Sequence, residues 1–232
     1  MKNIGAHSTA ARSLRKAVPS SEGARERIDR VAYELFSRRG IRGVGIDAVI
    51  AESGVAKMTL YRHYPSKEKL ALAFLQRREE LWTRAWLQDE VERRARAPGD
   101  RLLVIFDVFD KWFRHADFEG CSFINVLLET DNRASPVRIA TVHHLEVIRN
   151  FLRQLARDAG VIDADGFARQ WHILMKGSIV AAAEGDKDAA RRAKELGVLL
   201  LVKEKVAYGP SVKLAPKLAA RKKAPIRAAG KQ

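Results

Sequence analysis

Apolar residues recur along most of this 232-residue chain at the spacing of an α-helix. Within residues 24–39, Ile28, Val31 and Leu35 fall on one face, and charged side chains line the other. The same spacing returns as far as about residue 207, whereas runs that alternate apolar and polar residues are hard to find. The pattern therefore predicts an all-α fold.

Three short helices are predicted at the start of the regular pattern. The first covers residues 24–39 and ends at Gly40, a residue type that commonly follows the last turn of a helix. The second covers residues 46–53. The third begins after Gly54 and ends before Pro65, because the residue preceding a proline is pushed out of the helical region. Two short helices joined at a glycine and braced by a third form a helix-turn-helix unit.

The third of these helices carries the side chains with the clearest chemistry. Val55 and Leu60 are expected to anchor it in the core, since a helix of about two turns is not stable alone. The other side chains would then face outward: Lys57, Met58, Thr59, Tyr61, Arg62 and His63. Two cations, a hydroxyl, a phenol and an imidazole, with no acidic residue, suit the surface of a DNA duplex.

The order of residues in this region resembles that of a known family. The chain resembles the DNA-binding domain of the tetracycline-repressor (TetR) family of bacterial transcription regulators in Gly40, in the turn Ile50-Ala51-Glu52-x-Gly54-Val55, and in the string Thr59-Leu60-Tyr61-x-His63-Tyr64-x-Ser66-Lys67-Glu68-x-Leu70. The resemblance covers about residues 24–72. It implies a homodimeric repressor that binds a palindromic double-stranded DNA operator and is released from it by a small-molecule ligand.

The resemblance also implies roles for single side chains. Lys57, Met58 and Tyr61 match positions that reach the bases or the floor of the major groove, where lysine can donate to guanine and methionine can contact a thymine methyl. The positions that tend to hold phosphates are matched by Thr59, Arg62, His63 and Lys67.

This chain departs from the family pattern at one position. Members often begin the second helix with serine or threonine, whereas Gly45 stands there in this chain, and Arg42 is expected to supply a phosphate contact instead. Tyr64 is expected to belong to the core rather than to the DNA contact, because aromatic side chains are commonly packed.

The rest of the chain predicts a larger helical domain, which resembles the family only in kind and length. A long helix is expected from Ser66 to about Arg96, ended by Pro98-Gly99. Further helices are predicted at about 100–116, 121–131, 136–159, 163–184 and 187–207. We divide the chain into a basic arm at 1–22, a helix-turn-helix domain at 23–72, a regulatory and dimerisation domain at 73–207, and a basic tail at 208–232.

The last two long helices allow two interpretations. Apolar residues follow the helical period in both, and Gly177, Ser178 and the alanines at 181–183 are small enough for another helix to approach closely. These features fit an ordinary core. The resemblance favours instead a four-helix interface with a second copy of the chain, so we expect a homodimer through these helices.

Aromatic side chains in the second domain could line a cavity for the regulatory ligand that the resemblance implies. The aromatic candidates are Trp82, Trp86, Phe109, Trp112 and Trp171, and the polar groups expected to orient a ligand are Cys121, Asn125 and His144. Aromatic stripes also occur as plain core. Likewise Cys121, the single cysteine, fits either an oxidant-sensing thiolate at a helix start or a buried inert thiol.

No enzyme is indicated. The chain lacks a phosphate-binding loop, HExxH and GxSxG, and His143-His144 cannot share a metal because neighbouring side chains on a helix point about 100° apart. We expect no catalytic site, metal or cofactor. One cysteine excludes an internal disulfide, and no apolar run is long enough to span a bilayer, so a cytoplasmic protein without a membrane partner is expected.

The formal net charge of +15 indicates a polyanionic partner. Basic residues are in excess in residues 1–66 and 203–232, whereas residues 67–202 are nearly neutral. The ends of the chain should therefore meet the anion. This distribution leaves a second function open, in which a DNA-coating protein without sequence preference is driven by its basic ends.

Overall fold

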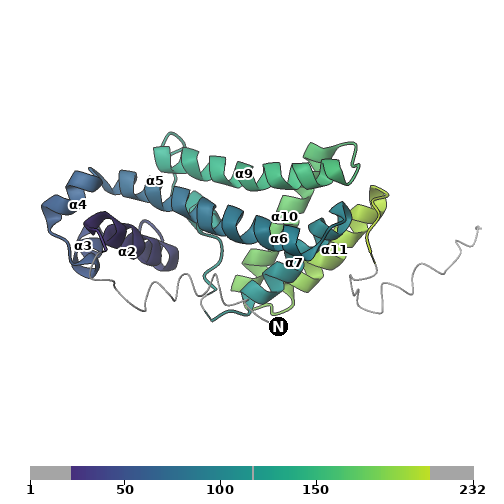
Figure 1. Cartoon of the computed structure of the whole chain (residues 1–232), viewed down its shortest axis with the longest axis horizontal. Coiled ribbons are helices and arrows are strands. Elements are labelled where there is room, and N and C mark those ends of the chain that lie inside the picture. The colour runs from purple at the N-terminus through teal and green to yellow at the C-terminus, as the bar shows by residue number, and fades with distance from the viewer. Residues whose placement is uncertain (1–21, 117, 210–232) are drawn as a thin grey trace, which may run out of the picture.

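The computed structural model describes residues 22–116 and 118–209, and all regular structure in these ranges is helical, which confirms the all-α fold. The molecule is elongated. Its N-terminal domain, at one end, contains α2 (Ala24–Arg39), α3 (Ile46–Ser53) and α4 (Lys57–His63) (Figure 1). The expected basic arm and tail lie almost wholly outside the described residues.

The three helices of the N-terminal domain end where the sequence predicts. Ile28 and Val31 of α2 are buried on the predicted face. Gly40 follows α2 with a φ of 69°, and Gly54 follows α3 with a φ of 64° and donates its N–H to the carbonyl of Ile50 at 3.1 Å. Positive φ values favour glycine, which explains why this residue type ends both helices.

One continuous helical rod joins the two domains, as predicted. It consists of α5 (Lys67–Arg78), a π-helical segment η1 (Glu79–Gln88) and α6 (Asp89–Arg94). Ser66 caps α5 by accepting the backbone N–H of Lys69 at 3.2 Å. The π-helical segment was not expected, because its apolar spacing does not differ clearly from that of an α-helix.

Phe74 fixes the rod against the N-terminal domain. Its ring meets those of Tyr33 and Phe36 edge-on, with centroids 5.7 and 5.5 Å apart. Leu70, one turn earlier, is also buried. Both residues pack back onto this domain as the sequence predicts.

The segment after the rod differs from the prediction. The rod already ends at Arg94, and Pro98 begins the next helix, α7 (Pro98–Phe113). Proline suits the first position of a helix because the N–H that it lacks would have no partner within the helix. Gly99 is fixed by packing, since a Cβ there would lie 2.2 Å from the carbonyl oxygen of Ala207.

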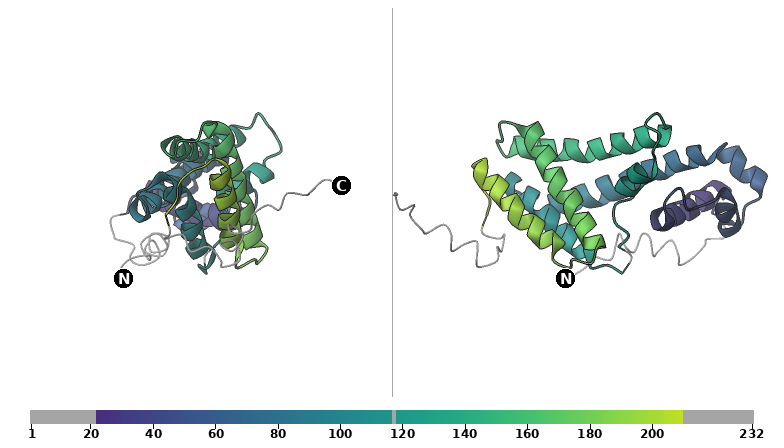
Figure 2. Two further views of the ribbon diagram at one scale, coloured as in Figure 1. Left: turned by 90° about the vertical axis from the view of Figure 1, so that its right-hand side faces the viewer. Right: turned by 180° about the vertical axis from the view of Figure 1, so that it is seen from behind.

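Four further helices complete the C-terminal domain. They are α8 (Ser122–Glu129), α9 (Pro136–Asp158), α10 (Ala164–Ala183) and α11 (Ala189–Lys203), each within a few residues of its predicted range. Helix α9 lies alongside the rod, and α10 packs against both α9 and α11 (Figures 1 and 2). Helix α11 approaches α10 closely at Gly197, where a Cβ would lie 2.8 Å from the ring of Trp171.

A buried carboxylate and a buried histidine join the rod to α9. Glu79 and His144 lie 2.5 Å apart between Oε2 and Nδ1, and Arg84 binds the other carboxylate oxygen at 2.6 Å. Burial opposes ionisation of Glu79, but the hydrogen bonds from His144 and Arg84 outweigh burial and lower its pKa. The rod is therefore held to α9 by a charged contact inside the core.

A second buried histidine, His172 of α10, has no such partner. Its Nδ1 atom makes no hydrogen bond within the described residues. Burial, together with the nearby cations Lys176 and Arg149, lowers its pKa to about 3. The ring is therefore neutral in the folded chain at physiological pH.

Acid should destabilise the folded chain through His172. An unfolded histidine binds a proton near pH 6.5, but the folded ring does so only at about pH 3. Between these values the unfolded state holds more protons, so the free energy of unfolding falls by about 1.4 kcal/mol per pH unit of acidification. Denaturant titrations at about pH 7.5 and about pH 5 measure how much free energy of unfolding is lost on acidification. This loss should be about 2 kcal/mol smaller in His172→Leu than in wild type. Equal losses in the two proteins would contradict this assignment.

Candidate nucleic-acid interface

Helix α4 is a two-turn element held by its inner side. Leu60 is fully buried, and Val55, just before the helix, is nearly so, which confirms both predicted anchors. The backbone N–H groups of Thr59 and Leu60 donate to the carbonyl of Ala56 at 2.9 and 3.2 Å and close the first turn. The helix needs this support because seven residues are too few for independent stability.

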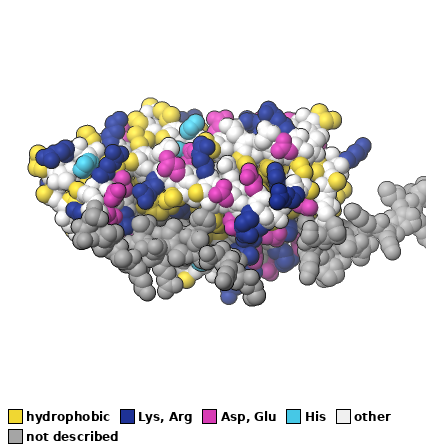
Figure 3. All heavy atoms as spheres, in the orientation of Figure 1, with side chains coloured by type: hydrophobic (Ala, Val, Ile, Leu, Met, Phe, Trp, Pro, Cys, Tyr) yellow, Lys and Arg dark blue, Asp and Glu magenta, His cyan; other side chains and the backbone are white. Residues whose placement is uncertain are grey.

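The outer side of α4 carries the side chains predicted to meet DNA. Met58 is 74% exposed and Tyr61 is 37% exposed, although large apolar and aromatic side chains are usually packed. Lys57, Arg62 and His63 are exposed too, and Thr59 is half-buried. Figure 3 shows basic side chains and histidine at this end of the molecule, although basic side chains also lie elsewhere on the same face. The structure thus brings six of the predicted residues onto one helix, and their contacts with DNA stay a prediction.

Tyr64 follows α4 and belongs to the core, as predicted. Its hydroxyl donates a hydrogen bond to the carboxylate of Asp29 on α2, and the guanidinium of Arg25 lies 6.0 Å from the ring centroid. Burial and the Asp29 hydrogen bond raise the pKa of Tyr64, so the hydroxyl keeps its proton. This contact ties the end of α4 to α2.

The two remaining candidates lie outside α4, and both have carboxylates of the C-terminal domain nearby. Lys67 begins α5; burial lowers its pKa, and the nearby Glu129 carboxylate partly offsets that effect. Arg42 lies in the turn before α3, and its guanidinium pairs with Asp131 at 2.9 Å. A phosphate contact by Arg42 therefore requires this exposed ion pair to open. Gly45 provides no side-chain cap for α3.

The aromatic residues proposed to line a cavity come together between η1 and α7. Trp82, Trp86, Phe109 and Trp112 form one cluster, with ring centroids 5.3 to 6.2 Å apart. Trp171 joins it through Phe106, at 5.5 Å. This is the part of the ligand prediction that the fold brings together.

The polar residues proposed to orient a ligand lie in other settings. Asn125 is exposed on α8. Cys121 is buried, and burial raises the pKa of its thiol, which disfavours the thiolate of an oxidant sensor. His144 is bonded to Glu79 and stacks on Phe123 with a centroid separation of 5.3 Å. Sequence analysis missed Glu79, since a single glutamate in a helix carries no sign of a buried partner.

Comparisons with known proteins agree with this geometry. Residues 28–74 match the family of bacterial regulatory proteins named after TetR, and residues 98–196 match the tetracyclin repressor-like C-terminal domain. The chain is 30% identical over 135 residues to the HTH-type transcriptional activator FasR of Mycolicibacterium smegmatis, covering 56% of this chain and 58% of FasR. It is 34% identical over 53 residues to an HTH-type transcriptional regulator of Staphylococcus aureus, covering 23% of this chain and 29% of that protein. These alignments span less than two thirds of either curated relative.

A solved structure is similar over nearly its whole length. The TetR-family transcriptional regulator from Streptomyces coelicolor superposes with a TM-score of 0.72 at 26% identity, covering 78% of this chain and 95% of that one. None of the described helices of our protein is both long and apolar enough to cross a membrane. Because both domains match in order and the fold is shared over 78% of this chain, the chain belongs to the TetR family, whose members are DNA-binding transcriptional regulators and not enzymes.

Proposed function

We propose that this protein is a homodimeric repressor that binds a palindromic operator and is released from it by a small-molecule ligand. The observation that carries the proposal is α4, whose Leu60 is buried while Met58 and Tyr61 face solvent among cations. A helix of this kind fits a major groove. Two copies would place their α4 helices in successive grooves, about 34 Å apart or somewhat more.

Base reading and backbone binding would be divided among the exposed residues. Lys57, Met58 and Tyr61 would read base edges. The phosphates would be held by Thr59, Arg62, His63, Lys67 and, once its ion pair with Asp131 opens, Arg42. This division follows the chemistry of the groups, since cations and hydroxyls suit phosphate oxygens, and sequence is read at base edges.

A second copy of the chain has a suitable surface on α10 and α11. Their outer sides carry five large apolar side chains that are 46–64% exposed: Ile173, Val180, Leu196, Leu199 and Val202. Both helices lie on the rear face, seen in the right-hand view of Figure 2. An apolar surface of this kind supports a four-helix interface, in which dimerisation would remove these side chains from water.

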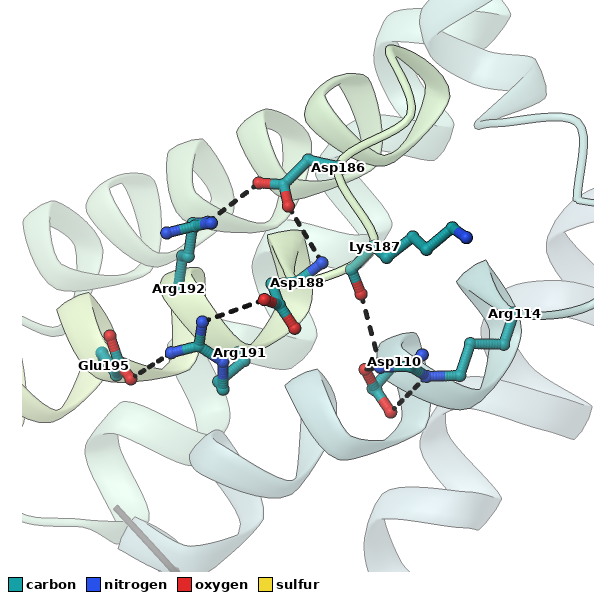
Figure 4. A network of polar contacts seen from close by, with 8 residues as sticks. All are labelled: Asp110, Arg114, Asp186, Lys187, Asp188, Arg191, Arg192 and Glu195. Carbon is teal, nitrogen blue, oxygen red and sulfur yellow. Dashed lines mark hydrogen bonds and ion pairs between the residues drawn. The ribbon is translucent and has the colours of Figure 1, made fainter. Parts of the chain in front are cut away.

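Ion pairs hold the start of α11 beside this surface (Figure 4). Arg191 pairs with Asp188 at 3.1 Å, and Arg114, which directly follows α7, donates to the backbone carbonyl of Lys187 at 3.4 Å. Surface ion pairs are individually weak, so their value here is geometric. The Arg114 hydrogen bond ties the turn between α10 and α11 to the end of α7, which supports a fixed angle between the two helices of the proposed interface.

A ligand would act from the C-terminal domain. The indole N–H groups of Trp82 and Trp171 and the hydroxyl of Thr83 are buried without a hydrogen-bond partner among the described residues. Buried donors normally find partners, so a ligand with hydrogen-bond acceptors suits this region. Trp82 and Thr83 belong to the rod that carries the DNA-binding domain. A ligand that prefers another position of the rod would shift the population away from operator binding.

Activation is the second candidate for the direction of regulation, because FasR is named an activator. Selection of bound fragments from genomic DNA tests the proposal and separates the two. Operators that overlap promoter elements would support repression, whereas operators upstream of them would support activation. Bound fragments without a shared sequence would contradict both and favour the DNA-coating function.

Replacing Tyr61 and Lys67 should separate base reading from backbone binding. Tyr61→Ala should weaken operator binding about tenfold to a hundredfold and hardly change nonspecific binding, since a base contact is worth about 1–3 kcal/mol. Lys67→Ala should weaken both by a similar factor and reduce the salt dependence. Fluorescence anisotropy at matched salt measures these losses, with Lys69→Ala as the control for a lost lysine. Equal losses from Tyr61→Ala on both DNAs would contradict base reading.

A charge on the proposed dimer surface should separate the two copies. Leu199→Lys would place an ammonium group in an apolar interface, so the variant should sediment as a monomer and bind the operator at least about tenfold more weakly. Ile162→Lys is the matched control, because Ile162 is fully exposed in the turn before α10 and outside the proposed surface. A Leu199→Lys variant that stays dimeric at the same concentration would place the interface elsewhere.

A further inference from the structure

The C-terminal domain contacts the N-terminal domain at a second place besides the rod. Glu129, the last residue of α8, lies against the turn that follows α2. Its Oε2 atom accepts the backbone N–H of Arg42 at 3.2 Å, across 87 residues of sequence. This contact joins a helix of the regulatory domain directly to the turn that leads into the helix-turn-helix.

Gly40 makes room for the Glu129 carboxylate. A Cβ at residue 40 would lie 1.9 Å from Oε1 of Glu129, so the carboxylate would have to move away. The positive φ of Gly40 is a separate reason for glycine at this position. Glycine therefore serves both to end α2 and to form a socket for a side chain from α8.

The ion pairs around this socket all have the same polarity, with the cation on the N-terminal domain and the carboxylate on the C-terminal domain. Cations of the N-terminal domain meet carboxylates of the segments that flank α8: Arg42 pairs with Asp131 at 2.9 Å, and Arg38 pairs with Glu119 at 3.2 Å. Lys67 lies near enough to Glu129 for the carboxylate to favour its charged form. The outer pairs are exposed and weak. The Glu129 contact differs from these pairs, because its carboxylate packs closely into the space that the missing side chain of Gly40 leaves.

The rod holds the N-terminal domain by apolar packing at Leu70 and Phe74. Such packing is non-directional, so it resists a small rotation of the domain only weakly. The Glu129 contact lies at a different place, on the turn after α2, and a second attachment there opposes that rotation. The direction of α4 decides which pair of grooves a dimer can reach at once, because each added base pair moves a half-site by about 3.4 Å and turns it about the DNA axis.

We propose that Glu129, seated on Gly40, is a positioning residue that fixes the direction of the DNA-binding domain and hence the half-site spacing that the dimer accepts. Glu129 does not touch DNA in this scheme. The inference rests on the proposed function as a dimer on a two-half-site operator.

The test compares spacing preference with half-site affinity. The operator returned by the genomic selection is rebuilt with its spacer changed by one and by two base pairs, and a single half-site is measured beside the series. Wild type should lose at least about tenfold in affinity for each changed base pair. Glu129→Ala should lose less than about threefold while binding the single half-site as wild type does, because α4 itself is unaltered.

Three further variants sharpen the result. Glu129→Gln keeps an acceptor of the same length for the Arg42 N–H and should retain the wild-type spacing profile. Gly40→Ala should reproduce the Glu129→Ala profile, since its Cβ expels the carboxylate. Glu92→Ala removes an exposed glutamate from α6, far from the socket along the rod, and should behave as wild type.

The outcomes are distinguishable. An unchanged spacing profile in a folded Glu129→Ala variant, shown by an unfolding transition like that of wild type, would overturn the positioning role while leaving the proposed function intact. A wild-type protein that binds one half-site as tightly as two would overturn the dimeric function and this inference with it.

Discussion

The surface proposed to face DNA depends on the burial of one leucine. Helix α4 has seven residues and could not persist alone, so its outer side chains are presented only because Leu60 is fully buried beneath them. The hydroxyl of Tyr64 then ties the end of the helix to Asp29 on α2. Removing either contact would leave the exposed cations in place along the chain but without a common direction. In the proposed function, recognition of a groove is thus a consequence of packing on the opposite side of the helix.

A helical rod connects the C-terminal domain to the N-terminal domain that contains this helix. The middle of the rod is π-helical. The π-helical segment carries Glu79, whose buried contact with His144 fixes the rod to α9, and Trp82, which begins the aromatic cluster shared with α7. π-helical segments are rare and frequently occur at functional sites. A regulator needs a part of this kind, stiff enough to hold the DNA-binding domain and adjustable in the region proposed for the ligand.

Much of the candidate site could be predicted because it lies within a short stretch. The residues from Lys57 to His63 share one helix, so spacing alone assigns Leu60 to the core and its neighbours to solvent. The ligand-domain candidates were harder. The aromatic residues on η1 and α7 cluster together, and their role in a ligand site stays a prediction. The exposure of Asn125 and the pairing of His144 depend on how α8 and α9 dock, which periodicity does not specify.

By itself, the sequence determined the helices, their order and most of their ends, because apolar period, glycine and proline act within a few residues. Only the tertiary structure decided that Glu79 meets His144 and that Glu129 occupies the space above Gly40. The physical reason is separation along the chain. Such contacts join residues 65 and about 89 positions apart, and each arises from the docking of whole helices, whose angles depend on every side chain between them.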